Sequence, residues 1–125
     1  MNTQPKTQMI AIVDDDESVR SAIHSLLKST GLKTRLFASA EEFLASGQQT
    51  EIACLITDIR MPGMSGLELQ AKLAAEGCRV PIIFITAYTD ARTRMQAMRA
   101  GAVEFLGKPF NDELLLKSVG AALAN

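Results

Sequence analysis

Short apolar runs alternate along the chain with segments in which apolar residues recur at helical spacing. The runs at 9–14, 53–57 and 82–85 are rich in β-branched side chains and are bounded by polar or turn residues. Apolar runs of this length predict buried strands. A more polar run at 33–37 predicts an edge strand, and a short run at 103–106 predicts a fifth strand.

Five helices are expected between and after these strands. The clearest pattern covers 17–30, where Val19, Ile23 and Leu26 recur at helical spacing before Gly31, a residue type common at helix ends. The remaining helices are predicted between Ser39 and Gly47 and over 66–76, 90–100 and 112–123.

The alternation of strands and helices predicts an α/β fold, in which a five-stranded parallel sheet has helices on both faces. Right-handed crossovers leave few strand orders. The doubly wound order 2-1-3-4-5 puts the polar strand at an edge, and its ligand crevice lies outside the carboxyl ends of strands 1 and 3. We expect a single domain over residues 1–125, with a core from about 8 to 124 and a flexible N-terminus at 1–7.

Aspartates come directly after two of the buried strands. Asp14 and Asp15 follow the first strand, and Asp58 follows the third. Because these strands end at the same edge of the sheet, we expect the carboxylates to lie close together. Two unit charges about 4 Å apart repel by roughly 4 kcal/mol at an effective dielectric constant near 20. A hard cation or a phosphoryl group would explain such a cluster.

Two further strand ends lead to the same crevice. Thr86 ends the fourth strand, and Lys108 follows the fifth strand, directly before Pro109. Several oxygen ligands in one place suit Mg²⁺. One carboxylate can act as a nucleophile and form an acyl phosphate, while the cation, Lys108 and Thr86 stabilise charge on the phosphoryl oxygens.

The length and charge of the chain limit the classes of function. A chain of 125 residues is typical of one domain, and 13 basic against 14 acidic residues create no field that favours nucleic acid or anionic membranes. No apolar run approaches the ~20 residues that span a bilayer, and the polar N-terminus lacks the apolar stretch of a signal peptide. Cys54 and Cys78 show no disulfide pattern. These features predict a cytoplasmic protein that contacts neither membrane nor nucleic acid directly.

Four motifs resemble the receiver domain of two-component response regulators. They occur in order and at matching spacing from about residue 8 to 123. The motifs are Val13-Asp-Asp15, Thr57-Asp-Ile-Arg-Met-Pro-Gly-Met-Ser-Gly66, Thr86-Ala87 and Lys108-Pro-Phe110. The stretch from Ala100 to Phe110 is most similar to FixJ-type transcriptional regulators. The resemblance implies a flavodoxin-like (CheY-like) three-layer sandwich and a phosphorylation-activated signalling switch, and it implies that the chain is not an enzyme.

The resemblance also implies roles for the acidic residues. Asp58 would accept a phosphoryl group from a phosphohistidine on a sensor histidine kinase. Asp15, Asp58 and the backbone carbonyl of Arg60 would hold Mg²⁺ directly, and Asp14 would act on the metal through water. Magnesium is therefore the expected cofactor.

Four other positions take roles from the same resemblance. Thr86 and Lys108 would engage the phosphoryl group, and Thr86 would shift together with Phe105, which stands where many receivers have a tyrosine. Arg60 and Tyr88 occupy positions that govern water access to the acyl phosphate. Two bulky side chains at these positions predict a long-lived phosphoryl bond.

The predicted output surface combines the helix at 90–100, the strand at 103–106 and the last helix. Leu114–Leu116 are consecutive, so they fan over about 200° of the last helix and cannot all face the sheet. Met95 and Met98 are expected to be core residues. A polar stripe on the fourth helix is formed by Arg92, Gln96 and Arg99. We expect phosphorylation-dependent homodimerisation through this surface, and any DNA-binding function in a C-terminal domain outside this chain.

Two alternatives come from other classes of protein. Asp14-Asp-Asp-Glu-Ser18 loosely fits the signature of haloacid-dehalogenase-like phosphohydrolases, with Asp14 as nucleophile and Asp16 as general acid. That assignment leaves Asp58 and the loop at 62–66 unexplained. A flavodoxin-like cofactor binder needs a phosphate-binding loop after the first strand, and the acidic residues there would repel a phosphate.

Overall fold

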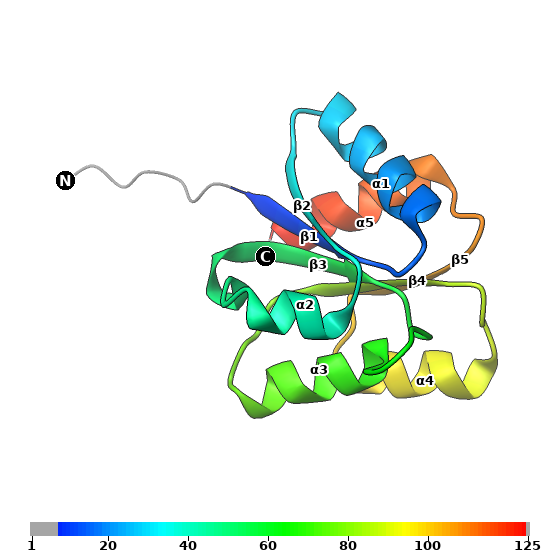
Figure 1. The fold of residues 1–125 in the computed structure, drawn as a ribbon. Helices are drawn as coiled ribbons and strands as arrows, with labels where there is room; N and C mark the ends of the chain where they lie inside the picture. The colour runs from blue at the N-terminus through cyan, green and yellow to red at the C-terminus, as the bar shows by residue number, and fades with distance from the viewer. Residues whose placement is uncertain (1–7, 125) are drawn as a thin grey trace.

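Buried apolar runs form a five-stranded parallel sheet in the computed structural model, which describes residues 8–124 (Figure 1). The strand order is β2-β1-β3-β4-β5, so the predicted doubly wound order is confirmed. The elements in chain order are β1 (Met9–Val13), α1 (Glu17–Ser29), β2 (Lys33–Phe37), α2 (Ala40–Ala45), η1 (Gln49–Glu51), β3 (Ile52–Thr57), α3 (Gly66–Ala75), β4 (Ile82–Thr86), α4 (Ala91–Arg99), β5 (Glu104–Gly107) and α5 (Asp112–Leu123).

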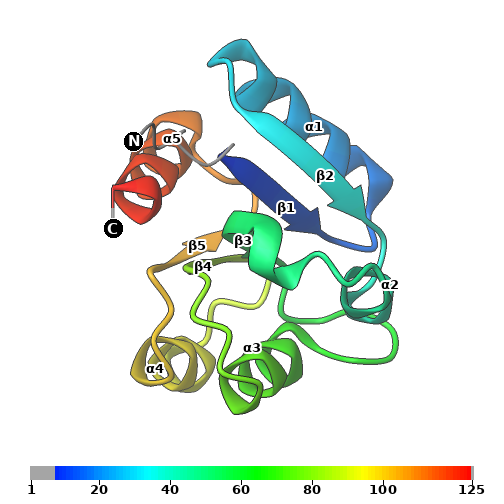
Figure 2. The same ribbon diagram turned by 90° about the vertical axis from the view of Figure 1, so that its left-hand side faces the viewer.

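Helices cover both faces of the sheet and make three layers (Figure 2). Side chains alternate between the faces along each strand. Ile10 and Ile12 of β1 pack in one buried cluster with α1 and α5, and Ala11 and Val13 pack in the other with α2, α3 and α4. The sheet is therefore buried on both faces, which is why its central strands are almost entirely apolar.

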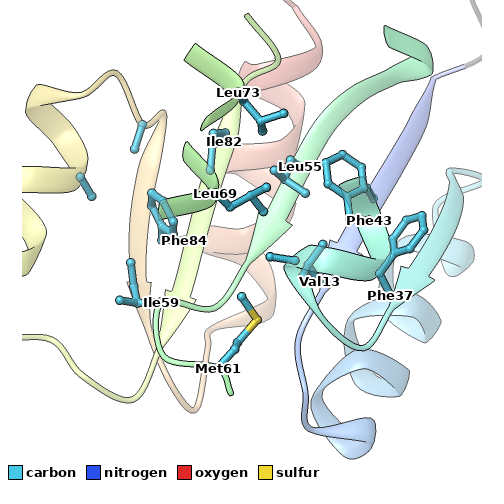
Figure 3. Packing of buried hydrophobic residues seen from close by; sticks show 14 of the residues in the cluster. Val13, Phe37, Phe43, Leu55, Ile59, Met61, Leu69, Leu73, Ile82 and Phe84 are labelled. Atoms are coloured by element: carbon cyan, nitrogen blue, oxygen red, sulfur yellow. The ribbon is translucent and has the colours of Figure 1, made fainter. Parts of the chain in front are cut away.

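The segment after β3 is anchored in the second of these clusters (Figure 3). Ile59 and Met61 are 5% and 9% exposed and belong to the same cluster as Phe84 of β4. Met61 therefore packs against the core beneath the loop. Since these side chains directly follow Asp58, burial of the loop also restricts where that carboxylate can lie.

Helix α4 departs from the prediction. Met95 and Met98 are 54% and 37% exposed, so their expected place in the core was wrong. The buried residue of α4 is Ala97, whose small side chain brings the helix close to the sheet. At 100° per residue, a helix that buries position 97 turns both methionines away from the sheet. The sequence prediction considered only the large apolar residues of this helix and left out Ala97, so it placed the wrong face of α4 against the sheet.

The three consecutive leucines of helix α5 differ in burial. Leu115 is fully buried, Leu116 packs at the margin of the cluster, and Leu114 is 52% exposed. The predicted exposure of part of this run is confirmed. The 3-10 helix η1 before β3 was not predicted.

Two other expectations concern the chain as a whole. The N-terminal segment 1–7, expected to be flexible, lies outside the described residues. Within 8–124, none of the helices combines the length and the hydropathy needed to cross a bilayer. The cytoplasmic location stays a prediction.

Candidate functional site

The backbone brings Asp14 and Asp58 to the same edge of the sheet. The Asp58 N–H donates to the Val13 carbonyl at 3.1 Å, and the Asp14 N–H donates to the Phe37 carbonyl at 3.1 Å. These bonds extend the ladders of the three neighbouring strands by one residue beyond their ends. As a result, carboxylate oxygens of Asp14, Asp15 and Asp58 all lie within 4.8 Å of one another.

Lys108 enters this cluster from the end of β5. Its N–H donates to the Thr86 carbonyl at 2.9 Å, which ties it to the end of β4, and the Lys108–Pro109 peptide bond is cis. The ammonium Nζ lies 2.7 Å from Asp58 Oδ2 and 2.9 Å from Asp14 Oδ2. One cation thus bridges two buried carboxylates.

The protonation of Asp14 and Lys108 reflects this arrangement. Burial raises the pKa of Asp14, and hydrogen bonds from the Asp16 N–H and from Lys108 only partly offset that rise. Burial disfavours the charged form of Lys108, but its hydrogen bonds to Asp58 and Asp14 outweigh this, so the pKa of Lys108 is raised. The raised pKa of Asp14 thus reflects its burial, and the raised pKa of Lys108 reflects its hydrogen bonds to the two carboxylates.

Asp58 is oriented by the backbone that follows it. Its Oδ1 accepts hydrogen bonds from the Ile59 N–H at 2.6 Å and the Arg60 N–H at 3.4 Å, while Oδ2 faces Lys108. The Gly66 N–H donates to the Ile59 carbonyl at 2.7 Å. A Cβ on Gly66 would clash with the Asp58 carbonyl oxygen, so only glycine fits at the start of α3.

Thr86 is the last residue of β4, and Arg60 and Tyr88 lie on the loops after β3 and β4. Thr86 is fully buried, and its hydroxyl accepts a hydrogen bond from the Tyr88 N–H at 3.2 Å. The Arg60 guanidinium stacks over the Tyr88 ring at 4.0 Å from the ring centroid, a cation–π contact. This pair joins the loop after β3 to the loop after β4.

Phe105 is buried in β5, with 3% of its surface exposed. Its ring lies 6.4 Å from the Phe84 ring, measured between centroids. The Arg94 guanidinium lies 5.9 Å from the Phe105 ring centroid and donates to the Phe105 carbonyl at 3.5 Å. The aromatic side chain is therefore inside the protein in this conformation.

Sequence reasoning missed three residues around the site. Arg20 of α1 donates a hydrogen bond to the Asp14 carbonyl, and Arg94 covers Phe105. Glu41 accepts a hydrogen bond from the Met64 N–H in the loop after β3. An acid in the first turn of a helix, as Glu41 is in α2, by itself signals only a favourable helix-dipole contact. No local pattern signals a partner 23 residues away.

The cluster has the chemistry of a cation site. Ligand oxygens at the roughly 2.1 Å bond length of Mg²⁺ lie at most about 4.2 Å apart. The carboxylate oxygens of Asp14, Asp15 and Asp58, within 4.8 Å of one another, come close to that span. Hard oxygen donors of this kind suit Mg²⁺. The acidic residues therefore fit a small divalent cation by donor type, and their oxygens are near enough to one another to converge on one ion.

Comparisons with known proteins agree with this geometry. The family described as response regulator receiver domain matches residues 10–120. Response regulator protein TmoT of Ectopseudomonas mendocina is 46% identical over 123 residues, which cover 98% of this chain and 55% of that protein. Transcriptional regulatory protein FixJ of Azorhizobium caulinodans is 40% identical over 119 residues, which cover 95% of this chain and 56% of that protein. The crystal structure of FixJ-N has a TM-score of 0.85 at 36% identity, over 98% of this chain and 97% of that one.

The chain spans about half the length of the curated relatives it matches. The matched family agrees neither with the phosphohydrolase alternative, which has Asp14 as nucleophile, nor with the flavodoxin-like cofactor binder. The acidic triad is typical of the metal-binding site of receivers. By its fold, its Asp14/Asp15/Asp58 and Lys108 pocket and these matches, the chain belongs to the response regulator receiver domain family and is similar to FixJ-type regulators, and a receiver domain is regulatory rather than enzymatic.

Proposed function

We propose that the chain is a phosphorylation-activated switch in which Asp58 accepts a phosphoryl group from a phosphohistidine of a sensor histidine kinase. A carboxylate oxygen of Asp58 attacks phosphorus, the bond from phosphorus to the imidazole nitrogen breaks, and its electron pair stays on that nitrogen. The product is an acyl phosphate. The observation that carries the proposal is that Asp58 lies within 4.8 Å of two more carboxylates and 2.7 Å from the Lys108 ammonium.

In this proposal Asp15, Asp58 and the Arg60 backbone carbonyl would hold Mg²⁺ directly, and Asp14 would act on it through a water molecule. Mg²⁺ supplies positive charge that offsets the charge on the transferring phosphoryl oxygens. The buried Asp14 carboxylate, whose pKa is raised mainly by burial, is a group that gains from a nearby cation.

Lys108 and Thr86 act on the phosphoryl group. Lys108 reaches two carboxylates in this structure, so its ammonium lies where a phosphoryl oxygen on Asp58 would form the same kind of charge-assisted hydrogen bond. The Thr86 hydroxyl oxygen accepts a hydrogen bond from the Tyr88 N–H here, and its O–H donates to a phosphoryl oxygen. We infer that Thr86 then shifts together with Phe105 and changes the surface above β5.

Arg60 and Tyr88 form a gate over the acyl phosphate. Their cation–π contact at 4.0 Å places bulky groups from two loops next to the site and limits the approach of a hydrolytic water. We expect a phosphoryl half-life much longer than seconds, and shorter half-lives in Arg60→Ala and Tyr88→Ala variants. Decay of the phosphorylated form, followed by intact mass, measures this. A half-life of seconds for the unaltered chain contradicts the gate.

The output surface combines α4, β5 and α5, and we propose that it forms a homodimer after phosphorylation. Apolar side chains at its edges are exposed, with Met98 at 37% and Leu114 at 52%. Sedimentation with and without an acyl-phosphate mimic tests this, and a monomer at high concentration under both conditions excludes it. Because relatives such as FixJ are longer transcriptional regulators, we also propose that the receiver controls an attached DNA-binding domain.

The central test is incubation with Mg²⁺ and acetyl phosphate, followed by intact mass and peptide mapping. The unaltered chain gains one phosphoryl group on Asp58, and the gain requires Mg²⁺. Asp58→Asn does not react, while Asp16→Asn serves as a matched control because Asp16 is an exposed helix cap outside the cluster. Label on Asp14, or an unchanged gain in Asp58→Asn, excludes the proposal.

A further inference from the structure

The loop between β3 and α3 is held from outside by a side chain of α2. The Met64 N–H donates to Glu41 Oε2 at 2.8 Å, across 23 residues of sequence. The same oxygen occupies the space that a Cβ on Gly63 would need, and Gly63 has a φ of +77°, which favours glycine. The loop backbone thus approaches the carboxylate closely because residue 63 has no side chain. Figure 2 shows α2 beside this loop.

The contact is specific to one of two adjacent acids. Glu41 and Glu42 both lie in the first turn of α2. The Met64 N–H lowers the pKa of Glu41, as expected for a carboxylate that accepts a backbone hydrogen bond. The Glu42 carboxylate makes no hydrogen bond or ion pair with any residue in 8–124. Charge at the helix start therefore does not by itself account for the contact.

The loop that Glu41 contacts at Met64 begins with the site residues Asp58 and Arg60 and ends at the start of α3. Its first part is fixed by Ile59 and Met61 in the core, and its end by the capping box at the start of α3. Between these anchors, over residues 61–64, the only backbone N–H with a hydrogen-bond acceptor in the described chain is that of Met64. The middle of the loop thus depends on the Glu41 carboxylate for its backbone position.

We propose that Glu41 is a positioning residue for the phosphorylation site. Its carboxylate holds the loop so that the Asp58 carboxylate and the Arg60 carbonyl present their oxygens to one cation. This inference rests on the proposed function, and in particular on Arg60 as a metal ligand. Replacing groups that orient metal ligands typically weakens metal affinity about 10- to 100-fold. Glu41 acts through the loop backbone and is exposed, so we expect a loss of about three- to tenfold.

The test compares Glu41→Ala, Glu41→Gln and Glu42→Ala in the full 125-residue chain. The Mg²⁺ dissociation constant is measured by titration calorimetry, and the rate of phosphorylation by acetyl phosphate is measured against Mg²⁺ concentration. Glu41→Ala weakens Mg²⁺ binding about three- to tenfold and leaves the rate at saturating Mg²⁺ near that of the unaltered chain. Glu41→Gln, which keeps an oxygen acceptor for Met64, restores most of the affinity. Glu42→Ala removes the same charge from the same helical turn and binds Mg²⁺ normally.

Hydrogen exchange at the Met64 amide gives a readout that does not need phosphorylation. In metal-free protein the amide exchanges faster in Glu41→Ala than in Glu42→Ala, and Glu41→Gln restores protection. Unchanged Mg²⁺ affinity in Glu41→Ala, or equal losses in Glu41→Ala and Glu42→Ala, overturns the inference. An equal loss in Glu41→Gln and Glu41→Ala also overturns it, because charge and not the hydrogen bond would then act.

The failure of this inference differs from the failure of the proposed function. If the unaltered chain is not phosphorylated on Asp58, the switch proposal fails whatever Glu41 does. If Asp58 is phosphorylated and all three variants bind Mg²⁺ equally, only the role of Glu41 is excluded. Circular dichroism confirms that each variant is folded, and the conservative Glu41→Gln variant keeps the comparison valid if Glu41→Ala does not fold.

Discussion

Replacing Lys108 with methionine removes an ammonium that bridges two buried carboxylates and keeps most of the side-chain volume. Its Nζ lies 2.7 Å from Asp58 Oδ2 and 2.9 Å from Asp14 Oδ2. At an effective dielectric constant near 20, each contact supplies about 6 kcal/mol of Coulomb attraction before the desolvation of the ammonium is subtracted. Removing one partner of a buried ion pair costs about 3–5 kcal/mol. Because the Lys108 side chain is 18% exposed, we expect the lower limit, about 3 kcal/mol.

Thermal unfolding with and without Mg²⁺ measures this effect. A loss of about 3 kcal/mol lowers the melting temperature of a domain of this size by roughly 10 °C in EDTA. In saturating Mg²⁺ the metal replaces the missing positive charge, so Lys108→Met gains more from Mg²⁺ than the unaltered chain does. Lys117→Met is the matched control, since Lys117 is exposed and has no ion pair within residues 8–124.

Equal melting temperatures of Lys108→Met and Lys117→Met in EDTA would refute the reasoning, because the ammonium would then not compensate the acidic cluster. The same conclusion follows if Mg²⁺ stabilises Lys108→Met and the unaltered chain by equal amounts. In that case the cation and the ammonium would not act on the same carboxylates.

Three further predictions test the site. Mg²⁺ at about 100 times its dissociation constant stabilises the unaltered chain by about 2.7 kcal/mol, and a melting temperature indifferent to millimolar Mg²⁺ excludes the metal site. Because the pKa of Lys108 is raised, its ammonium stabilises the folded state fully below the ordinary pKa of 10.5. This stabilisation is lost as the pH rises through the higher pKa of the folded state. Urea unfolding in EDTA should therefore show that the difference in stability between the unaltered chain and Lys108→Met shrinks above pH 10.5. Gly66→Ala forces a Cβ against the Asp58 carbonyl and lowers the free energy of unfolding, measured in urea, by about 2 kcal/mol or more. Gly120→Ala has open space around its Cβ and raises the free energy of unfolding by up to about 1 kcal/mol. Equal stabilities of the two glycine variants contradict the close approach.

Much of the fold was predictable because its signals are local. The five strands are short apolar runs, and parallel strands joined by helices allow few orders. The observed bounds differ from the predicted ones by about one residue at most strands. The fully buried Ala97 shows the limit of this reasoning, because an alanine is compatible with either face of a helix. Only the packing of α4 on the sheet decided that Met95 and Met98 face outward.

The candidate site was predictable where residues lie at strand ends. Asp14, Asp58 and Lys108 each follow a strand directly, so the strand order alone predicted that they meet. Glu41 could not be found this way, because its partner in the loop after β3 is 23 residues away and depends on the path of that loop.

The amino-acid sequence by itself determined the strands, their order and the edge of the sheet at which the carboxylates gather, because alternating apolar runs and right-handed crossovers leave little choice. From the sequence alone, Lys108 was expected in the same crevice as the three carboxylates, but the contacts among these groups were not. Tertiary structure placed the Lys108 ammonium against Asp58 and Asp14, formed the Arg60–Tyr88 contact beside them and set Glu41 against the loop. These contacts join segments far apart in the chain, and their distances depend on how helices and loops pack rather than on any local pattern.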